Sequence, residues 1–144
     1  METNLEKARS LLDTGKYTCV VCRDNQIHTT TDRGVAPLLF WLETETDLNG
    51  FSAADRVVGR GAAFLYCLLG VKEVYAQVMS EPAAEVLRAY GICAQAGTFV
   101  EGIINRKGTG PCPFEAAVMD IRDAREALTA IRNKRKQMQE GANV

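Results

Sequence analysis

The stretch VKEVYAQVMSEPAAEVLRAYGICAQA, residues 71–96, decides the fold of this chain. Residues 71–79 alternate imperfectly between apolar and polar side chains, a pattern typical of a largely buried strand. Ser80-Glu81-Pro82 then starts a helix that runs through Tyr90, and Gly91 ends it. Residues 92–96 are expected to form a short second strand. The stretch therefore predicts a strand, a helix and a strand in direct succession.

The residues before this stretch predict a hairpin between helices. Apolar side chains at helical spacing indicate a helix over residues 4–13 and another over residues 35–42. Residues 17–22 and 26–31 are rich in β-branched and aromatic side chains, which favour strands. Asp24-Asn25 lies between them and favours a tight turn, so the two strands are predicted to form a hairpin.

The remaining segments complete a single-domain prediction for residues 1–144. Another helix is expected to begin between Ser52 and Gly59 and to end at Leu69. Residues 99–104 are expected to form a further strand, and residues 113 to about 137 one long helix or two. Strands that alternate with helices after an initial hairpin predict an α/β fold, a three-layer α/β/α sandwich with a mixed sheet.

Composition is that of an ordinary globular protein. Hydrophobic residues make up 47% of the 144 residues and the formal net charge is −1, which indicates no bias toward nucleic acid or an anionic membrane. The basic run Arg132, Lys134, Arg135 and Lys136 is interpreted as the end of the last helix, where cations complement the helix dipole. The N-terminus lacks the apolar core of a signal peptide, and no stretch approaches the roughly 20 apolar residues that span a bilayer. The cytoplasm is therefore the expected location, with no membrane partner.

The five cysteines are expected to be reduced thiols, because their count is odd and no export signal accompanies them. Cys19 and Cys22 have CxxC spacing, but on a strand positions i and i+3 point to opposite faces and cannot share a metal ion. The single histidine, His28, lies in the predicted hairpin. No second close pair of ligands is present, so we predict no metal site and no cofactor.

The segment NRKGTGPCPFE, residues 105–115, has the pattern of a glycine-rich turn that leads into a helix. Cys112 would occupy the N-cap, Pro113 the first helical position and Glu115 the third, from which its carboxylate can reach back to the cap. This structural interpretation is favoured. The functional alternative is a reactive thiol, because a helix N-terminus favours the thiolate and would make Cys112 a candidate catalytic residue.

The same segment can also be interpreted as an anion cradle. Backbone amides of Gly108, Thr109 and Gly110 would bind the anion. Asn105 and Arg106, with the adjacent Lys107, would add donors and positive charge. The Gly-x-Gly fragment alone is a weak signal, because its spacing is not that of a Walker motif.

Gly59-Arg60-Gly61 is a second candidate site. Small residues at a helix start permit close approach by backbone or ligand, and Arg60 would place a charge there. The alternative is tight packing of the helix on the sheet with a solvated arginine. The residues by themselves leave both interpretations open.

Four segments together resemble an uncharacterised microbial family, a domain of unknown function with the cytidine-deaminase-like fold. They are VVGRGAA (57–63), VKEVYA (71–76), SEPA (80–83) and NRKGTGPCP (105–113). Zinc deaminases of that fold use H-x-E or C-x-E at the start of one helix and P-C-x-x-C at the next. Here Gly59-Arg60-Gly61 replaces the first motif, and Ala83 and Val86 replace both cysteines of the second. The resemblance therefore implies the fold but not zinc-dependent deamination.

The resemblance also implies a pocket where two helix N-termini converge, near Gly59 and near Glu81. With Arg60 in place of zinc, such a pocket would suit a small anionic or nucleotide-like ligand. Two alternatives stay open: a Cys112-dependent enzyme without an obvious general base, and a structural module that forms homo-oligomers. Whether the chain is an enzyme is left undecided. The candidate ligand-binding residues are Gly59, Arg60, Gly61, Ser80, Glu81, Asn105, Arg106, Gly108, Thr109 and Gly110.

Overall fold

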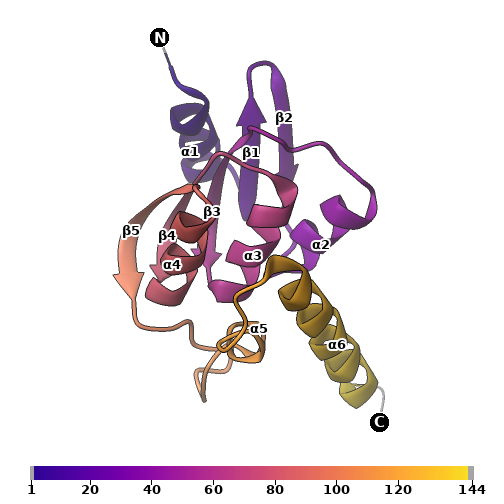
Figure 1. The fold of residues 1–144 in the computed structure, drawn as a ribbon. Helices are drawn as coiled ribbons and strands as arrows, with labels where there is room; N and C mark the ends of the chain where they lie inside the picture. Colours follow the sequence, from indigo (N-terminus) through magenta and orange to yellow (C-terminus); the bar gives the residue numbers. More distant parts are fainter. Residues whose placement is uncertain (1, 143–144) are drawn as a thin grey trace.

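A five-stranded mixed sheet forms the centre of the computed structural model, which describes residues 2–142 (Figure 1). The strand order is β2-β1-β3-β4-β5. β1 pairs antiparallel with both β2 and β3, whereas β3, β4 and β5 are parallel. The strands are β1 (Cys19–Arg23), β2 (Gln26–Thr30), β3 (Ser52–Val58), β4 (Glu73–Ser80) and β5 (Cys93–Val100).

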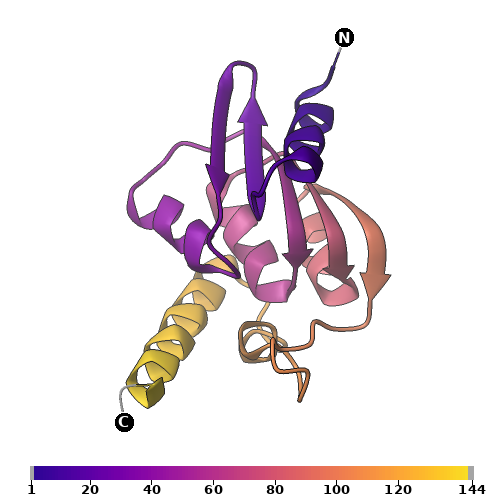
Figure 2. The same ribbon diagram turned by 180° about the vertical axis from the view of Figure 1, so that it is seen from behind.

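Helices cover both faces of this sheet. α1 packs alone on one face, against β1 and β3 (Figure 2), and α2, α3 and α4 pack on the other, with α6 against α3 and α5. The predicted three-layer α/β/α sandwich is confirmed, with one layer that consists of a single helix. The helices are α1 (Asn4–Thr14), α2 (Ala36–Glu43), α3 (Arg60–Leu69), α4 (Glu81–Ala89), α5 (Pro113–Ala117) and α6 (Ala124–Ala142).

The two faces of the sheet have separate hydrophobic cores, and the CxxC pair contributes one cysteine to each. Cys19 belongs to the larger core beneath α2, α3 and α4, and Cys22 to the smaller core beneath α1. Both side chains are buried. The prediction that strand geometry separates these thiols is confirmed.

Strand β3 was not predicted, and the expectation that a helix begins within residues 52–59 is wrong. The strand opens with Ser52-Ala53-Ala54-Asp55, residues with little intrinsic preference for strands. Ala53 and Ala54 are fully buried, one toward each core. Small side chains at this central position let the helices of both layers lie close to the sheet, and tertiary packing overrides the local preference.

Two further boundaries differ from the sequence-based expectation. β5 is one continuous strand, and residues 99–104 form no second strand, since Ile104 makes only an isolated bridge to Pro111. The C-terminal region forms two helices, α5 and α6, one of the two alternatives predicted. The basic run at 132–136 lies inside α6, so the interpretation as a helix end is wrong. Residues 137–140 are favourable helix formers and extend α6 past the run.

No helix among residues 2–142 combines the length and the apolar character that crossing a membrane would require.

Candidate functional site

The helices α3 and α4 both begin at the carboxyl end of a parallel strand. Gly59 is the N-cap residue of α3, directly after β3, and Ser80 is both the last residue of β4 and the N-cap residue of α4. Val58 is the register partner of Met79 in the neighbouring strand. The two helix N-termini therefore lie side by side, with unpaired backbone N–H groups directed to one place.

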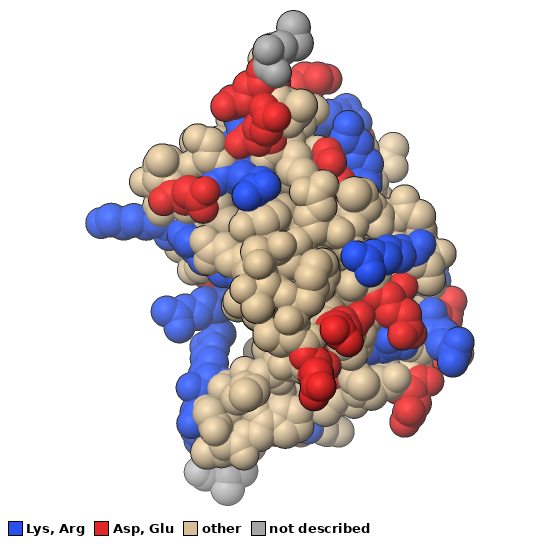
Figure 3. Space-filling view, turned by 90° about the vertical axis from the view of Figure 1, so that its left-hand side faces the viewer, with Lys and Arg blue, Asp and Glu red and all other residues tan. Residues whose placement is uncertain are grey.

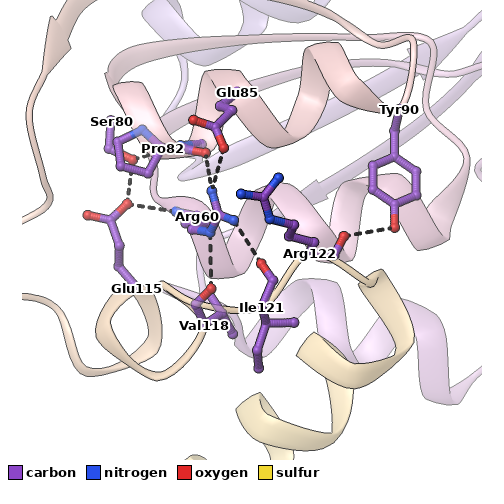
Figure 4. A network of polar contacts seen from close by, with 10 residues as sticks. Arg60, Ser80, Pro82, Glu85, Tyr90, Glu115, Val118, Ile121 and Arg122 are labelled. Atoms are coloured by element: carbon purple, nitrogen blue, oxygen red, sulfur yellow. Dashed lines mark hydrogen bonds and ion pairs between the residues drawn. The ribbon is translucent and has the colours of Figure 1, made fainter.

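The carboxylate of Glu115 lies at this place. Its Oε2 accepts a hydrogen bond from the Arg60 backbone N–H at 2.8 Å and another from the Ser80 hydroxyl (Figure 4). Its Oε1 accepts one from the Ile103 N–H at 2.6 Å. The residue is only 4% exposed. A negative charge at a helix N-terminus is stabilised by the helix dipole and by the free N–H donors. Glu115 thus acts as an internal anion at the start of α3.

Arg60 is buried, and its guanidinium donates hydrogen bonds to the segment that links β5 to α6. Its Nε donates to the Val118 carbonyl at 3.0 Å, and its Nη2 to the Ile121 carbonyl at 2.7 Å. Its Nη1 donates to the Pro82 carbonyl at 3.3 Å and contacts Glu85 Oε1 at 3.5 Å. Because the residue is only 5% exposed, the expectation of a solvated arginine is wrong. The guanidinium instead links the segment before α6 to the first turn of α4.

The glycines on either side of Arg60 also lie against the segment that links β5 to α6. A Cβ added to Gly59 would be 3.1 Å from Ile103 Cγ1, and one added to Gly61 would be 3.1 Å from the Phe114 carbonyl oxygen. The close approach that these small residues permit is made by the chain's own backbone and side chains.

The role of Glu115 differs from the sequence-based prediction. Cys112 is the N-cap residue of α5 and Pro113 follows it, as predicted, but no side chain caps this helix. The expectation that Glu115 reaches back to its own cap is wrong. The N-terminus of α3, 55 positions away along the chain, supplies its partner instead. A glutamate in the apolar run FEAAV was the one signal that could have pointed to its burial.

The loop 105–110 is closed by its own hydrogen bonds. Asn105 Oδ1 accepts from the Thr109 N–H at 3.0 Å, its Nδ2 donates to Thr109 Oγ1, and its carbonyl accepts from the Gly108 N–H at 3.0 Å. The N–H of Asn105 donates to the Gly110 carbonyl at 2.8 Å. Arg106 is exposed, and Figure 1 shows the loop extending away from the helices. The anion-binding role of this loop stays a prediction.

The structure therefore brings part of the predicted set together. Gly59, Arg60 and Ser80 meet around Glu115, and Gly61 lies against Phe114. Glu81 is exposed in the first turn of α4. The ligand-binding role of all of them stays a prediction, as does a catalytic role for Cys112.

The residues at this site do not fit a zinc ion. Within the described part of the chain, no group of three or more His, Cys, Asp or Glu side chains could hold a metal. Both oxygens of Glu115 already accept hydrogen bonds. A zinc-activated water therefore has no place in the chemistry of this site.

A second polar network, missed in the sequence, lies between β3 and α3. The Tyr66 hydroxyl donates to Asp55 Oδ2 at 2.6 Å and lies 3.1 Å from Cys19 Sγ. Burial raises the pKa of Asp55 to about 6 and also raises the pKa values of Tyr66 and Cys19. The network could not be anticipated because Asp55 was not assigned to a strand.

The cysteines are expected to differ strongly in reactivity. Cys93 is exposed and Cys112 half-buried, whereas Cys19 and Cys22 are buried and burial raises the pKa of Cys67 to about 12. Because the thiolate is the nucleophile, timed alkylation near neutral pH should modify Cys93 first, Cys112 more slowly and the others only after unfolding. Peptide mass spectrometry of the quenched samples measures this order. Modification of Cys112 ahead of Cys93 would contradict it and would favour the thiol-enzyme hypothesis.

Comparisons with known proteins agree with the fold. A crystal structure of a DUF1893 family protein from Thermotoga maritima is similar with a TM-score of 0.83 and 23% sequence identity, over 93% of this chain and 92% of that one. A weaker similarity, with a TM-score of 0.43 and 16% identity, is to a diaminohydroxyphosphoribosylaminopyrimidine deaminase/5-amino-6-(5-phosphoribosylamino)uracil reductase from Thermotoga maritima, over 83% of this chain and 41% of that one. No curated relative matches the chain.

The family model for a domain of unknown function, DUF1893, matches residues 7–135, nearly the whole chain. The family suggested by the four sequence segments is thereby confirmed, and this chain belongs to the DUF1893 family.

Proposed function

We propose that this chain is a zinc-independent binding domain for a small anionic, phosphate-bearing or nucleotide-like ligand. The ligand site is the junction of the α3 and α4 N-termini, where Glu115 now occupies the position of the anion. The main support for the proposal is that one oxygen of the Glu115 carboxylate accepts hydrogen bonds from both the Arg60 N–H and the Ser80 hydroxyl. The two helix starts thus form one donor set for an oxyanion.

The donor set suits a phosphate or carboxylate oxygen for a physical reason. Two backbone N–H groups, of Arg60 and Ile103, and the Ser80 hydroxyl point at the carboxylate, and hydrogen bonds to an ionised acceptor are about twice as strong as neutral ones. The buried Arg60 guanidinium keeps positive charge close by. An external oxyanion that replaces Glu115 would find the same partners.

Glu115 would then act as a built-in competitor. It is carried by α5, within the segment that links β5 to α6, and this segment must move for a ligand to enter. The apparent affinity of the site is reduced by the fraction of molecules in which Glu115 has left it. Wild-type protein is therefore expected to bind anions weakly, and removal of the carboxylate should strengthen binding.

Glu115→Ala tests this proposal directly, with inorganic phosphate and a nucleoside monophosphate as probes. Loss of the carboxylate leaves three buried donors unsatisfied, so phosphate should bind the variant at least tenfold more tightly than wild type and raise its melting temperature. Amide NMR signals of Arg60 and Ile103 should shift on titration. The matched control is Glu85→Ala, which removes an exposed carboxylate from α4 and should bind like wild type.

Two outcomes would reject the proposed function. One is that neither probe shifts the Arg60 or Ile103 amide signals of Glu115→Ala. The other is that the Glu115→Ala and Glu85→Ala variants respond equally. If Glu115→Ala does not fold, Glu115→Gln preserves the shape of the side chain without its charge, and the same titration decides.

A further inference from the structure

Strand β5 is an open edge of the sheet. Among residues 2–142 it pairs only with β4. It runs for eight residues, and its sequence CAQAGTFV contains neither a charged residue nor a proline. Natural proteins usually protect such edges with charges, proline or short length, because the unpaired N–H and C=O groups can pair with another strand. β5 has none of these protections.

The backbone groups of β5 alternate between β4 and the open side. The Cys93 N–H donates to the Lys72 carbonyl, and Cys93 is the register partner of Glu73. In a parallel ladder the polar groups of every second residue face the neighbouring strand. Those of Ala94, Ala96 and Thr98 therefore point away from the sheet, which leaves a row of unpaired donors and acceptors.

The opposite edge of the sheet is shorter and has charged residues close to both of its ends. β2 is only five residues long and is flanked by Arg23 and Asp24 at one end and by Asp32 and Arg33 at the other. Short length and flanking charges disfavour pairing with another chain. The chain thus protects one edge of its sheet and leaves the other available.

An uncharged band lies on the side of the molecule that contains β5. Figure 3 shows this band across the middle of that side, with charged residues on either side of it. Phe99 on β5 is 42% exposed, and Ile104 just beyond the strand is 67% exposed. Apolar side chains beside an unpaired edge favour its coverage by another strand.

We infer that β5 pairs with β5 of a second copy of this chain. Two identical strands related by a two-fold axis run antiparallel, so every outward N–H of one copy meets an outward C=O of the other. With the axis at Ala96, Ala94 of one copy lies opposite Thr98 of the other, and the two sheets join into one sheet of ten strands. Glu101, just past the end of β5, then lies near the start of β5 in the other copy, beside Lys72 of that copy. The charges at the two ends are complementary.

Sedimentation velocity over a wide range of protein concentration tests this interface. Wild type should sediment as a dimer. Thr98→Pro removes an outward N–H without breaking a bond within the sheet, and Gln95→Lys places like charges close together across the axis; each should raise the dissociation constant at least tenfold. Gln26→Lys makes the same change on β2 and should leave the dimer intact.

A charge exchange tests the antiparallel arrangement itself. Glu101→Lys should weaken the dimer, and the double variant Glu101→Lys/Lys72→Glu should restore it. A monomeric wild type at all concentrations would overturn the inference, as would a dimer that Thr98→Pro and Gln95→Lys leave unchanged. If Thr98→Pro does not fold, Gln95→Lys against Gln26→Lys decides alone.

Discussion

Replacement of Arg60 by alanine is expected to lower the free energy of unfolding by about 3 kcal/mol or more, because each buried acceptor left without its donor costs about 1–3 kcal/mol. The guanidinium donates to the carbonyls of Pro82, Val118 and Ile121. Alanine would leave these acceptors without their donor and a cavity beside α3, and each effect is destabilising. Urea unfolding followed by circular dichroism measures the change.

Two further variants separate the buried bonds of Arg60 from its charge. Arg60→Lys keeps the charge, but an ammonium group cannot reproduce the planar fork that reaches Val118 and Ile121 together, so we expect a clear loss of stability. Glu85→Ala removes the partner in the Arg60 ion pair, whose side chain is 72% exposed, and should change stability by less than about 1 kcal/mol. An Arg60→Ala variant as stable as Glu85→Ala would show that the buried bonds contribute nothing.

The second large effect is a dependence of stability on pH that originates at Asp55. Burial raises the pKa of Asp55 from its ordinary 3.8 to about 6. The folded protein therefore holds this proton more tightly than the unfolded chain does. The contribution of Asp55 to stability should be most favourable below about pH 4, decrease as the pH rises from about 4 to 6, and then level off. The contribution of this one group is about 3 kcal/mol, at 1.36 kcal/mol per pKa unit.

Asp55→Asn isolates this contribution from those of the other carboxylates. The amide oxygen can still accept the hydrogen bond from Tyr66, but the side chain no longer titrates. The difference in unfolding free energy between the variant and wild type, measured from pH 4 to 8, should change in favour of the variant as the pH rises. If the unfolding free energies of the two proteins changed equally with pH, the prediction would be contradicted.

Local patterns determined most of the elements. The period of apolar side chains located α1 and α2. Strand-forming residues on either side of Asp24-Asn25 located the hairpin of β1 and β2, and start and stop residues located α4. Strand geometry alone separated Cys19 from Cys22. The segments at 57–63, 71–76, 80–83 and 105–113 were sufficient to indicate the family.

The same patterns did not predict β3 or the contacts of Glu115. The start of β3 consists of small residues with little preference for a strand. Their strand conformation results from pairing with β1 and β4, which lie elsewhere in the sequence. For Glu115, local spacing offered a cap three residues away, but the N-termini of α3 and α4 together offer a backbone donor, a hydroxyl and helix dipoles. The stronger partner prevails because it satisfies a buried carboxylate completely.

The sequence by itself thus determined the layers of the fold, the family, and the absence of the zinc motifs at both helix starts. Tertiary structure alone decided that Arg60 is buried and that Glu115 occupies the place expected for an anion. The physical reason is that apolar periodicity is a local property, readable along the chain. The partner of a buried charge is chosen among all groups that folding brings within hydrogen-bonding distance, whatever their separation in sequence.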